Sequence, residues 1–399
     1  MTTTLEPATL TATPTRFNRD PEWAARSIRT LFLLQGDRRP FSPEEVEWAR
    51  TALNRGDDLG NRLARTMVDD HAFSMRDLDE ALTTGETTIP SLRDLLAVVD
   101  GSATPTWVDF AAIERGAAVC RRSGELGLDV LATASLMTGF TSSATTRQLV
   151  GTGKLVDDPG ARLQRTAKWW SEIIAPGAAM RPHHSGWKAA VRIRIIHGLA
   201  NTMLSRQDDW DRAEWGEPIN QSDQLATIGL FSTTFLLALR GLGMPLSRAE
   251  GNDVMALWRY VGWLLGVDED VLPATEFEGR RRMVQVGQYA PAPDANTAIL
   301  GAAMYEYFAE LNYPRMQAFQ RRFGQRYRGS LQAVFVGQSG LRELGIPAEH
   351  QWAVPVAWAR YFPIQMAARL SPRVREWATR RGERRINTLI SLNIPDGDK

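Results

Sequence analysis

The chain has 399 residues, of which 43% are hydrophobic and 23% are charged, a composition that is ordinary for a soluble globular protein. Because 47 Lys and Arg residues balance 46 Asp and Glu residues, the chain has no long-range field toward nucleic acid or an anionic membrane, and either partner would need a local basic patch. The single cysteine, Cys120, excludes an intramolecular disulfide and a structural zinc site made of cysteines.

The first 20 residues are rich in Thr, Pro and Ala and lack the basic region and apolar stretch of a signal peptide. We therefore expect a cytoplasmic protein with a disordered tail over residues 1–20 and a flexible end over 391–399. The longest apolar runs, such as Gly229 to Leu239, are short and contain hydroxyl residues, so no stable membrane insertion is expected. We interpret the Arg-rich stretch from Arg369 to Arg385 as a solvated helix face, and we expect no nucleic-acid partner.

Apolar residues recur every three or four positions over most of the chain, and this spacing predicts an all-α protein. No linker and no internal repeat interrupts residues 21–390, which we expect to form a single large helical domain. A capping box at Ser42 to Glu45 opens one helix, and others are expected at 109–123, 127–148, 158–174, 187–206, 221–242, 247–266, 294–310 and 347–378. The last should break at Pro355 and Pro363, because an interior proline removes a backbone donor.

Several motifs of common enzyme classes are absent or incomplete. The run Gly151-Thr152-Gly153-Lys154 lacks the four-residue gap and the following hydroxyl of a phosphate loop, and we interpret it as a turn. No Gly-x-Ser-x-Gly elbow and no His-Glu-x-x-His helix occurs, which argues against serine hydrolase and zincin chemistry. Cys120 lies in a helical context without a glycine-rich loop, so it is expected to be a buried small hydrophobe.

Five histidines remain as candidate ligands: His71, His183, His184, His197 and His350. His71 is expected at the surface, and His350 is expected to pack at the start of a helix. The adjacent pair His183 and His184 lies in a Pro- and Gly-rich loop, where neighbouring side chains diverge and do not easily share a metal.

His197 differs from the others in its surroundings. A rotation of about 100° per residue places Ala190, Ile193, Ala200 and Leu204 within about 60° of it, in the middle of an apolar helix face. The alanines and Gly198 leave room beside the imidazole for a flat group. From the residues alone, a purely structural core histidine is the simpler interpretation.

Four segments in order resemble one known family: RLQRTAK (162–168), VRIRIIH (191–197), EWGEPINQ (214–221) and LWRYVGWLLG (257–266). The chain is similar, from about Trp107 to Pro273, to the latex clearing proteins (rubber oxygenases) and the related oxygenases of the mycophenolic acid pathway. The resemblance implies a globin-like helical core around haem b, with O₂ as co-substrate.

The resemblance also implies roles for particular residues. His197 would be the axial ligand of the haem iron, and Arg162, Arg165 and Thr166 would be the polar residues on the distal side, where polarity decides between oxygen binding and activation. Arg194 and Asn201 flank His197 at i−3 and i+4, where a guanidinium could reach a propionate and an amide could fix a neighbouring group.

Helix geometry gives an independent view of the distal residues. Arg162 lies within about 60° of Thr166, whereas Lys168 points to the opposite side and Arg165 lies about 100° away, at the edge of that face. Arg162 and Thr166 can therefore enter a pocket that Lys168 cannot reach. The alternative is that Arg162 and Arg165 form surface pairs with Asp157 and Asp158.

The sequence departs from the family in one respect. Rubber-cleaving members carry a glutamate ahead of the distal helix, but the segment from Phe140 to Leu149 contains no carboxylate. Together with the expected cytoplasmic location, this favours a haem-dependent oxygenase of a small apolar isoprenoid- or acyl-like molecule over one that cleaves a polymer. A haem protein for electron transfer or gas sensing and a haem-free helical binding protein remain as alternatives.

Overall fold

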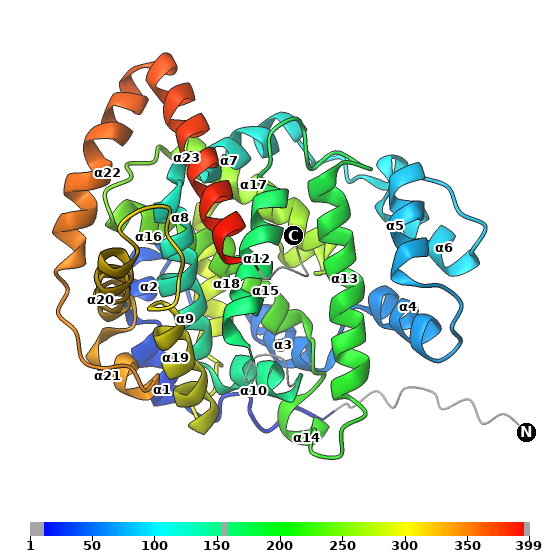
Figure 1. Cartoon of the computed structure of the whole chain (residues 1–399). Coiled ribbons are helices and arrows are strands. Elements are labelled where there is room, and N and C mark those ends of the chain that lie inside the picture. Colours follow the sequence, from blue (N-terminus) through cyan, green and yellow to red (C-terminus); the bar gives the residue numbers. More distant parts are fainter. Residues whose placement is uncertain (1–11, 153–157, 395–399) are drawn as a thin grey trace, which may run out of the picture.

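The computed structural model describes residues 12–152 and 158–394, and every regular element within these ranges is a helix (Figure 1). The expected all-α fold is thus confirmed. The N-terminal elements are α1 (Pro21–Ser27), α2 (Arg29–Leu34), α3 (Pro43–Thr51), η1 (Ala52–Asn54), α4 (Asp58–Val68), α5 (Met75–Thr84), α6 (Pro90–Val99) and η2 (Gly101–Ala103). The expected capping box of α3 is present, because Ser42 and Glu45 each accept a hydrogen bond from the backbone N–H of the other.

The middle of the chain forms the helices around which the others pack. They are α7 (Phe110–Ser123), α8 (Glu125–Val130), η3 (Leu131–Ser135), α9 (Leu136–Phe140), α10 (Ser143–Gly151), α12 (Pro159–Ile173), α13 (Ser185–Leu204), α14 (Arg212–Trp215), α15 (Gln221–Gly229), η4 (Leu230–Thr234), α16 (Phe235–Gly241) and α17 (Arg248–Leu264). The remaining elements are η5 (Glu269–Val271), α18 (Glu276–Gly287), α19 (Ala295–Tyr307), α20 (Gln317–Phe335), α21 (Gly337–Glu343), α22 (Ala353–Leu370) and α23 (Pro372–Asn393).

Helices with strong local start signals form where they were expected. Asp158 caps α12 by accepting a hydrogen bond from Ala161 N, and Ser247 with Glu250 forms the capping box of α17. The expected helix 127–148 is instead divided into α8, a π-helical turn η3, α9 and α10, with an interruption at Thr141 and Ser142. Ser142 has an extended backbone, which ends one helix and starts the next.

The expected breaks at Pro355 and Pro363 were wrong. Pro355 lies in the first turn of α22, where the missing N–H would have no partner in the helix, and Pro363 is accommodated inside the same helix. The chain turns instead at Ser371, whose extended backbone (φ −132°, ψ 120°) is the conformation that the following Pro372 favours. As a result, α22 and α23 form a helical hairpin.

Both ends of the ordered chain extend further than expected. Arg16 is only 3% exposed, and its Nη2 lies 2.9 Å from Asp223 Oδ2, so part of the expected tail 1–20 packs against the domain. At the other end α23 continues to Asn393, and Ile394 is buried. Residues 1–11, 395–399 and the internal segment 153–157, which includes Gly153 and Lys154, lie outside the described residues.

One continuous helix, Gln221–Gly241, is long and apolar enough by length and composition to span a membrane, which corrects the expectation that the apolar runs are too short. About 61% of its most apolar window is buried inside the protein, however, and a core helix passes the same test. Among the described residues it is the one helix with these properties.

Glycines allow two helix pairs to approach closely. A Cβ on Gly198 of α13 would lie 2.3 Å from Gly60 O of α4, and a Cβ on Gly116 of α7 would lie 2.2 Å from Asp253 O of α17. These distances are too short for any side chain. The position of α13, and hence of His197, therefore depends on a direct backbone contact with α4.

We predict that Gly198→Ala lowers the free energy of unfolding by about 1–3 kcal/mol, the usual cost of an extra methyl group in a packed interface. Gly241→Ala is the matched control, because no atom lies within 4 Å of a Cβ at that position. Chemical denaturation of both variants would measure the difference. Equal stability of the two variants would contradict the close contact between α13 and α4.

Candidate active site

The candidate site is built around His197 in the middle of α13. Ala190 and Leu204 on the same helix face are fully buried, whereas Ile193, His197 and Ala200 keep part of their surface accessible. The expected apolar stripe is thus present. Its central part, around the imidazole, is not covered completely by neighbouring side chains.

The imidazole of His197 is held in an environment that favours its neutral form. Burial lowers its pKa below the ordinary value of 6.5, and the nearby charge of Arg162 acts in the same direction, while Gln224 and Asp57 act against it. Its Nδ1 atom is buried and has no hydrogen-bond partner among the described residues. A neutral imidazole with an unused nitrogen is the form that binds a metal ion.

Gln224 of α15 is the second polar residue of the site, and no motif or periodicity pointed to it. It lies close enough to His197 to influence the imidazole pKa, yet neither atom of its amide meets hydrogen-bond geometry with another described residue. Buried polar atoms are normally paired. A ligand bound here could complete the hydrogen bonds of both side chains.

Arg162 of α12 supplies a cation to the same site. Its guanidinium is partly buried and makes no hydrogen bond or ion pair within residues 12–152 and 158–394. Burial and the charge of Arg165 lower its pKa. The alternative pairing with Asp158 is not seen, since that carboxylate caps α12, and Asp157 lies outside the described residues. A partly buried cation without a counter-charge is costly, and an anionic group of a ligand would offset this cost.

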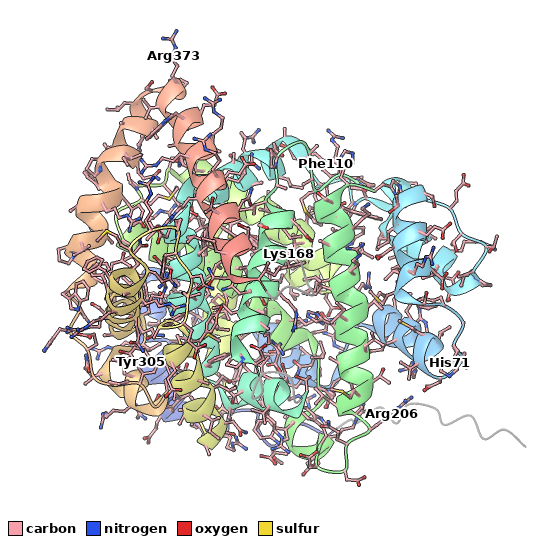
Figure 2. All side chains as sticks on the ribbon, viewed as in Figure 1. His71, Phe110, Lys168, Arg206, Tyr305 and Arg373 are labelled. Atoms are coloured by element: carbon pink, nitrogen blue, oxygen red, sulfur yellow. The ribbon has the colours of Figure 1, made fainter. Side chains whose placement is uncertain are left out.

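The other two residues of the expected distal set are more exposed. Thr166 donates its hydroxyl hydrogen bond to Arg162 O at 3.0 Å, and both Thr166 and Arg165 have exposed side chains. Within the described residues, no hydrogen bond joins Thr166 to His197. Lys168, labelled in Figure 2, lies beside Glu172, where burial raises the carboxyl pKa and the lysine charge opposes that rise. The structure thus brings Arg162 to His197, while the roles of Thr166 and Arg165 stay predictions.

Arg194 and Asn201 both bind other groups of the protein, and their role beside a cofactor stays a prediction. Arg194 forms a two-fold ion pair with Asp57, with Nε–Oδ2 at 2.6 Å and Nη2–Oδ1 at 2.7 Å. Asn201 donates to Glu217 Oε1 at 2.6 Å and accepts from the backbone N–H of Ile219 at 2.9 Å. Both residues lie to one side of His197 on the helix, where α4 and the loop before α15 pack against α13.

An aromatic cluster adjoins this polar group on the same face of α12. Trp169 lies 5.6 Å from Phe231 and 5.9 Å from Trp258 between ring centroids, and Phe231 stacks on Trp258 at 4.8 Å. Trp169 and Phe231 remain partly accessible, whereas Trp258 is fully buried. Trp169 lies two helical turns after Arg162 on α12, so the cluster forms an apolar wall beside the guanidinium.

Two other apolar residues of the neighbouring helices lie outside this cluster. Phe235 is buried against Trp170, at 6.0 Å between centroids, and Met137 is buried in a separate core cluster together with residues of α19. Helical periodicity identified these positions as apolar but could not tell which of them face the same space. Trp258, which completes the cluster, was not expected.

Two π-helical turns border the aromatic cluster. Phe231 belongs to η4, and Ser135 at the end of η3 donates a hydrogen bond to Leu230 O at 2.7 Å, which joins the two turns. Isolated π-helical turns are rare and are frequent at functional sites, because the extra residue changes the direction of the side chains. Their pairing here supports the assignment of this region as the site.

The remaining histidines lie elsewhere. His71 is at the surface near the outer end of α4 (Figure 2), and His184 and His350 are also exposed, so the expected packing of His350 was wrong. The two ring nitrogens of His183 are both paired: Nδ1 lies 3.0 Å from Leu82 O, and Nε2 lies 2.9 Å from Asp100 Oδ1. Among the described residues, no group of three or more His, Cys, Asp and Glu side chains could hold a metal ion.

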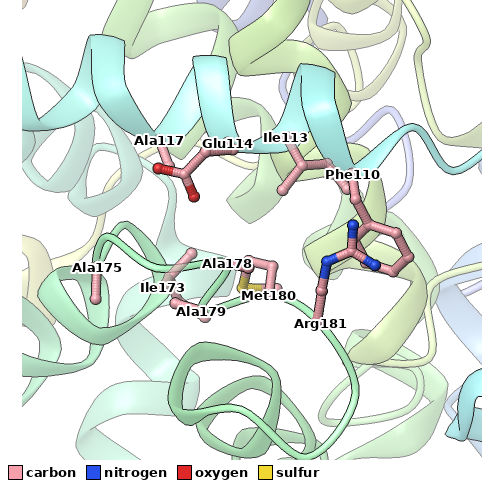
Figure 3. Close-up of a pocket in the computed structure, with 10 residues that line it drawn as sticks. All are labelled: Phe110, Ile113, Glu114, Ala117, Ile173, Ala175, Ala178, Ala179, Met180 and Arg181. Carbon is pink, nitrogen blue, oxygen red and sulfur yellow. The ribbon is translucent and has the colours of Figure 1, made fainter.

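Cys120 and a small pocket near α7 take no part in the site. Cys120 is fully buried, as expected, and burial raises the pKa of its thiol to about 12. The pocket in Figure 3 lies between α7 and the segment that follows α12, and the Arg181 guanidinium stacks over Phe110 at its edge, 4.8 Å from the ring centroid. It contains none of the residues expected to be functional.

The lowered pKa of His197 predicts a pH dependence of stability. Because the unfolded state binds a proton at this histidine more readily than the folded state, its contribution is fully present above about pH 6.5 and is lost as the pH falls through the folded pKa. The free energy of unfolding of the ligand-free protein should therefore fall more steeply between about pH 7 and pH 5 in the wild type than in His197→Asn. Identical slopes would show that the imidazole is not in a desolvated site.

Comparison with known proteins agrees with the fold. The Rubber oxygenase of Streptomyces sp. (strain K30) is 27% identical over 225 residues, which cover 54% of this chain and 54% of that relative, so the match spans about half its length. The solved structure of the latex clearing protein LCP in the closed state aligns with a TM-score of 0.63 over 86% of this chain and 92% of that chain; at 18% identity this likeness shows the fold alone.

The family described as "ER-bound oxygenase mpaB/B'/Rubber oxygenase, catalytic domain" matches residues 122–371, which is more than half of the chain and includes α12, α13, α15 and α17. The chain therefore belongs to this family of oxygenase catalytic domains.

Proposed function

We propose that this protein is a haem b-dependent oxygenase that uses O₂ to oxidise a small apolar isoprenoid- or acyl-like molecule, with or without cleavage of a carbon–carbon double bond. The observation that carries the proposal is the neutral imidazole of His197, with an unpaired buried nitrogen, beside the unpaired guanidinium of Arg162. Membership of an oxygenase family gives the reaction class.

The residues of the site fit haem b. A porphyrin supplies four nitrogen ligands, so one neutral histidine is what the protein must add, and His197 is such a residue. When bound, the haem would supply an iron centre that activates O₂. His197 would hold the iron. The unpaired amide of Gln224 would form a hydrogen bond with the buried edge of the ligand or with the imidazole.

Arg162 is the residue that we expect to stabilise negative charge during the reaction. Its guanidinium is already partly buried and is held on α12, so little reorganisation is needed when charge develops next to it. The same cation helps to keep His197 neutral, because each positive charge disfavours the other. Arg162 thus favours the neutral form of His197 and also provides a positive charge for an anionic group.

The aromatic cluster of Trp169, Phe231 and Trp258 would bind the apolar part of the substrate. Burial of a chain against it is favourable by about 0.8 kcal/mol for each methylene group. The segment 143–151, which precedes the distal helix, offers no carboxylate: Arg147 donates to Asp209 O at 2.6 Å and Gln148 donates to Asp223 at 2.7 Å. We therefore propose a small substrate and not a rubber polymer.

We predict about one haem b per chain and its loss, or severe weakening, in His197→Ala. The matched control is His184→Ala, which changes an exposed histidine just before α13 and should retain full haem. Haem content would be measured from the Soret band and a pyridine haemochromogen assay, with circular dichroism to verify folding. Full haem binding with an unchanged spectrum in His197→Ala would exclude this residue as the ligand, and a haem-free wild type would favour the binding-protein alternative.

For Arg162→Ala we predict that haem is retained while turnover falls by about 100-fold or more, the usual effect of removing a donor that stabilises developing charge. Lys168→Ala, on the opposite side of α12, should have turnover close to that of the wild type. Steady-state assays on haem-loaded protein would compare the two. Equal losses in both variants would mean that α12 does not present Arg162 to the reaction, and spectral change without any turnover in the wild type would favour the sensor or electron-transfer alternative.

Trp169→Ala should shift the preference among apolar alkenes toward longer or bulkier chains, by about 10-fold or more in relative kcat/KM, because it opens the apolar wall. Trp263→Ala is the control, since this partly buried tryptophan stacks on Tyr260 away from the cluster. A series of isoprenoid and acyl alkenes, tested alongside latex, would give the profile. Efficient cleavage of latex without turnover of any short alkene would contradict the proposed substrate class.

A further inference from the structure

We propose that the helical hairpin of α22 and α23 is a docking surface for an anionic lipid membrane. In Figure 1 the two helices run outward from the body of the protein and meet at a tip, and Figure 2 labels Arg373 at the outermost point. Residues 353–393 contain eight arginines, two glutamates and no lysine or aspartate, whereas the whole chain is balanced. The hairpin is thus strongly basic on a protein whose charges balance as a whole.

Part of this positive charge anchors the hairpin to the body. Arg360 and Arg385 both bind the buried carboxylate of Glu125, at 2.7 Å and 3.1 Å. Burial opposes ionisation of Glu125, but these two guanidiniums outweigh it and keep the carboxyl pKa below its ordinary value. The base of the hairpin is therefore held by paired charges.

Four other arginines of the hairpin have no such partners. The guanidiniums of Arg369, Arg373, Arg381 and Arg384 make no hydrogen bond or ion pair within the part of the chain that the structure describes, although Arg381 lies over the Trp377 ring at 5.3 Å. All four side chains are exposed. They are free to meet an anionic surface.

Two unpaired arginines of α23, Arg373 and Arg384, lie on its outer face. Ala378, Gly382 and Ile386 are buried, and Gly382 packs directly on Arg121 O of α7. Arg373, Trp377, Arg380 and Arg384 follow one another at intervals of four, three and four residues, which places them on the side opposite Gly382. Within this set Arg380 pairs with Glu376, whereas the guanidiniums of Arg373 and Arg384 have no partner among the described residues. This side of α23 is a basic stripe with one tryptophan in it.

The tip adds exposed apolar surface. Leu370 at the turn is 80% exposed, the highest value among the exposed large hydrophobic residues, and Trp377 and Trp358 are 43% and 42% exposed. A membrane interface accommodates all three features: leucine enters the acyl boundary, tryptophan sits at the headgroup level and arginine binds lipid phosphates. A nucleic acid would use the arginines but would leave Leu370 in water, so the lipid surface is the better match.

The inference goes beyond the proposed function and is compatible with it, because an apolar substrate would concentrate in a bilayer. The test uses the full-length protein and sedimentation with vesicles of phosphatidylcholine, with and without about 30% phosphatidylglycerol. We expect binding to the anionic vesicles only, and weaker binding at high salt. Equal binding to both kinds of vesicle, or no binding, would overturn the proposal.

The triple variant Arg373→Gln, Arg381→Gln and Arg384→Gln should lose roughly 100-fold in affinity for anionic vesicles, since each arginine near such a surface contributes about five-fold. The control variant Arg62→Gln, Arg65→Gln and Arg93→Gln removes the same charge from exposed positions on α4 and α6 and should bind as the wild type does. Leu370→Ser should also weaken binding. Equal losses in the two triple variants would overturn the proposal.

Single-stranded RNA serves as the second ligand in the same assay. If RNA binds the hairpin as tightly as the vesicles do, and Leu370→Ser changes neither affinity, the surface is a general polyanion site and the lipid assignment is wrong. Weak RNA binding, with a clear effect of Leu370→Ser on vesicles, supports it. Unchanged thermal unfolding of each variant verifies that the hairpin is intact, because the guanidiniums of Arg373, Arg381 and Arg384 make no hydrogen bond or ion pair with another described residue.

Discussion

The direct contact between α13 and α4 is the constraint on which the candidate site depends. Gly198 and Gly60 let the two backbones touch, and the ion pair between Arg194 and Asp57 fixes the rotation of α13 about its axis. Because that side of α13 packs against α4, the neighbouring face that carries His197 must point toward α12 and α15. An arginine and a glycine without any chemical role thus determine where the imidazole lies.

The way in which buried charges are paired distinguishes the site from the rest of the interior. Arg122 binds Glu250 at 2.6 Å and Arg328 binds Asp129 at 2.7 Å, as expected for charges that are removed from water. Arg162 has no such partner, and it lies beside a neutral imidazole and an unpaired amide. Unlike Arg122 and Arg328, Arg162 therefore depends on a ligand for a counter-charge.

Much of the fold could be predicted from the sequence because its signals are local. The caps at Asp158 and Ser247 depend on residues three positions apart, and α12 and α17 begin where those signals lie. The π-helical turns and the uninterrupted passage of α22 through Pro363 could not be predicted, because neighbouring helices determine them. The turn at Ser371 has a local signal in Pro372, but the two earlier prolines offered the same signal and gave no break.

The site was predictable to the extent that helical rotation fixes the direction of a side chain. It placed His197 on an apolar face and Arg162 on the inner side of α12, and the two residues do influence each other. Helical rotation could not identify which residue each side chain contacts. Arg194 lies only about 60° from His197 on the helix, yet that difference turns it to Asp57, which is 137 residues away in the chain. Gln224 carried no signal, since an isolated glutamine becomes functional only through the residues packed around it.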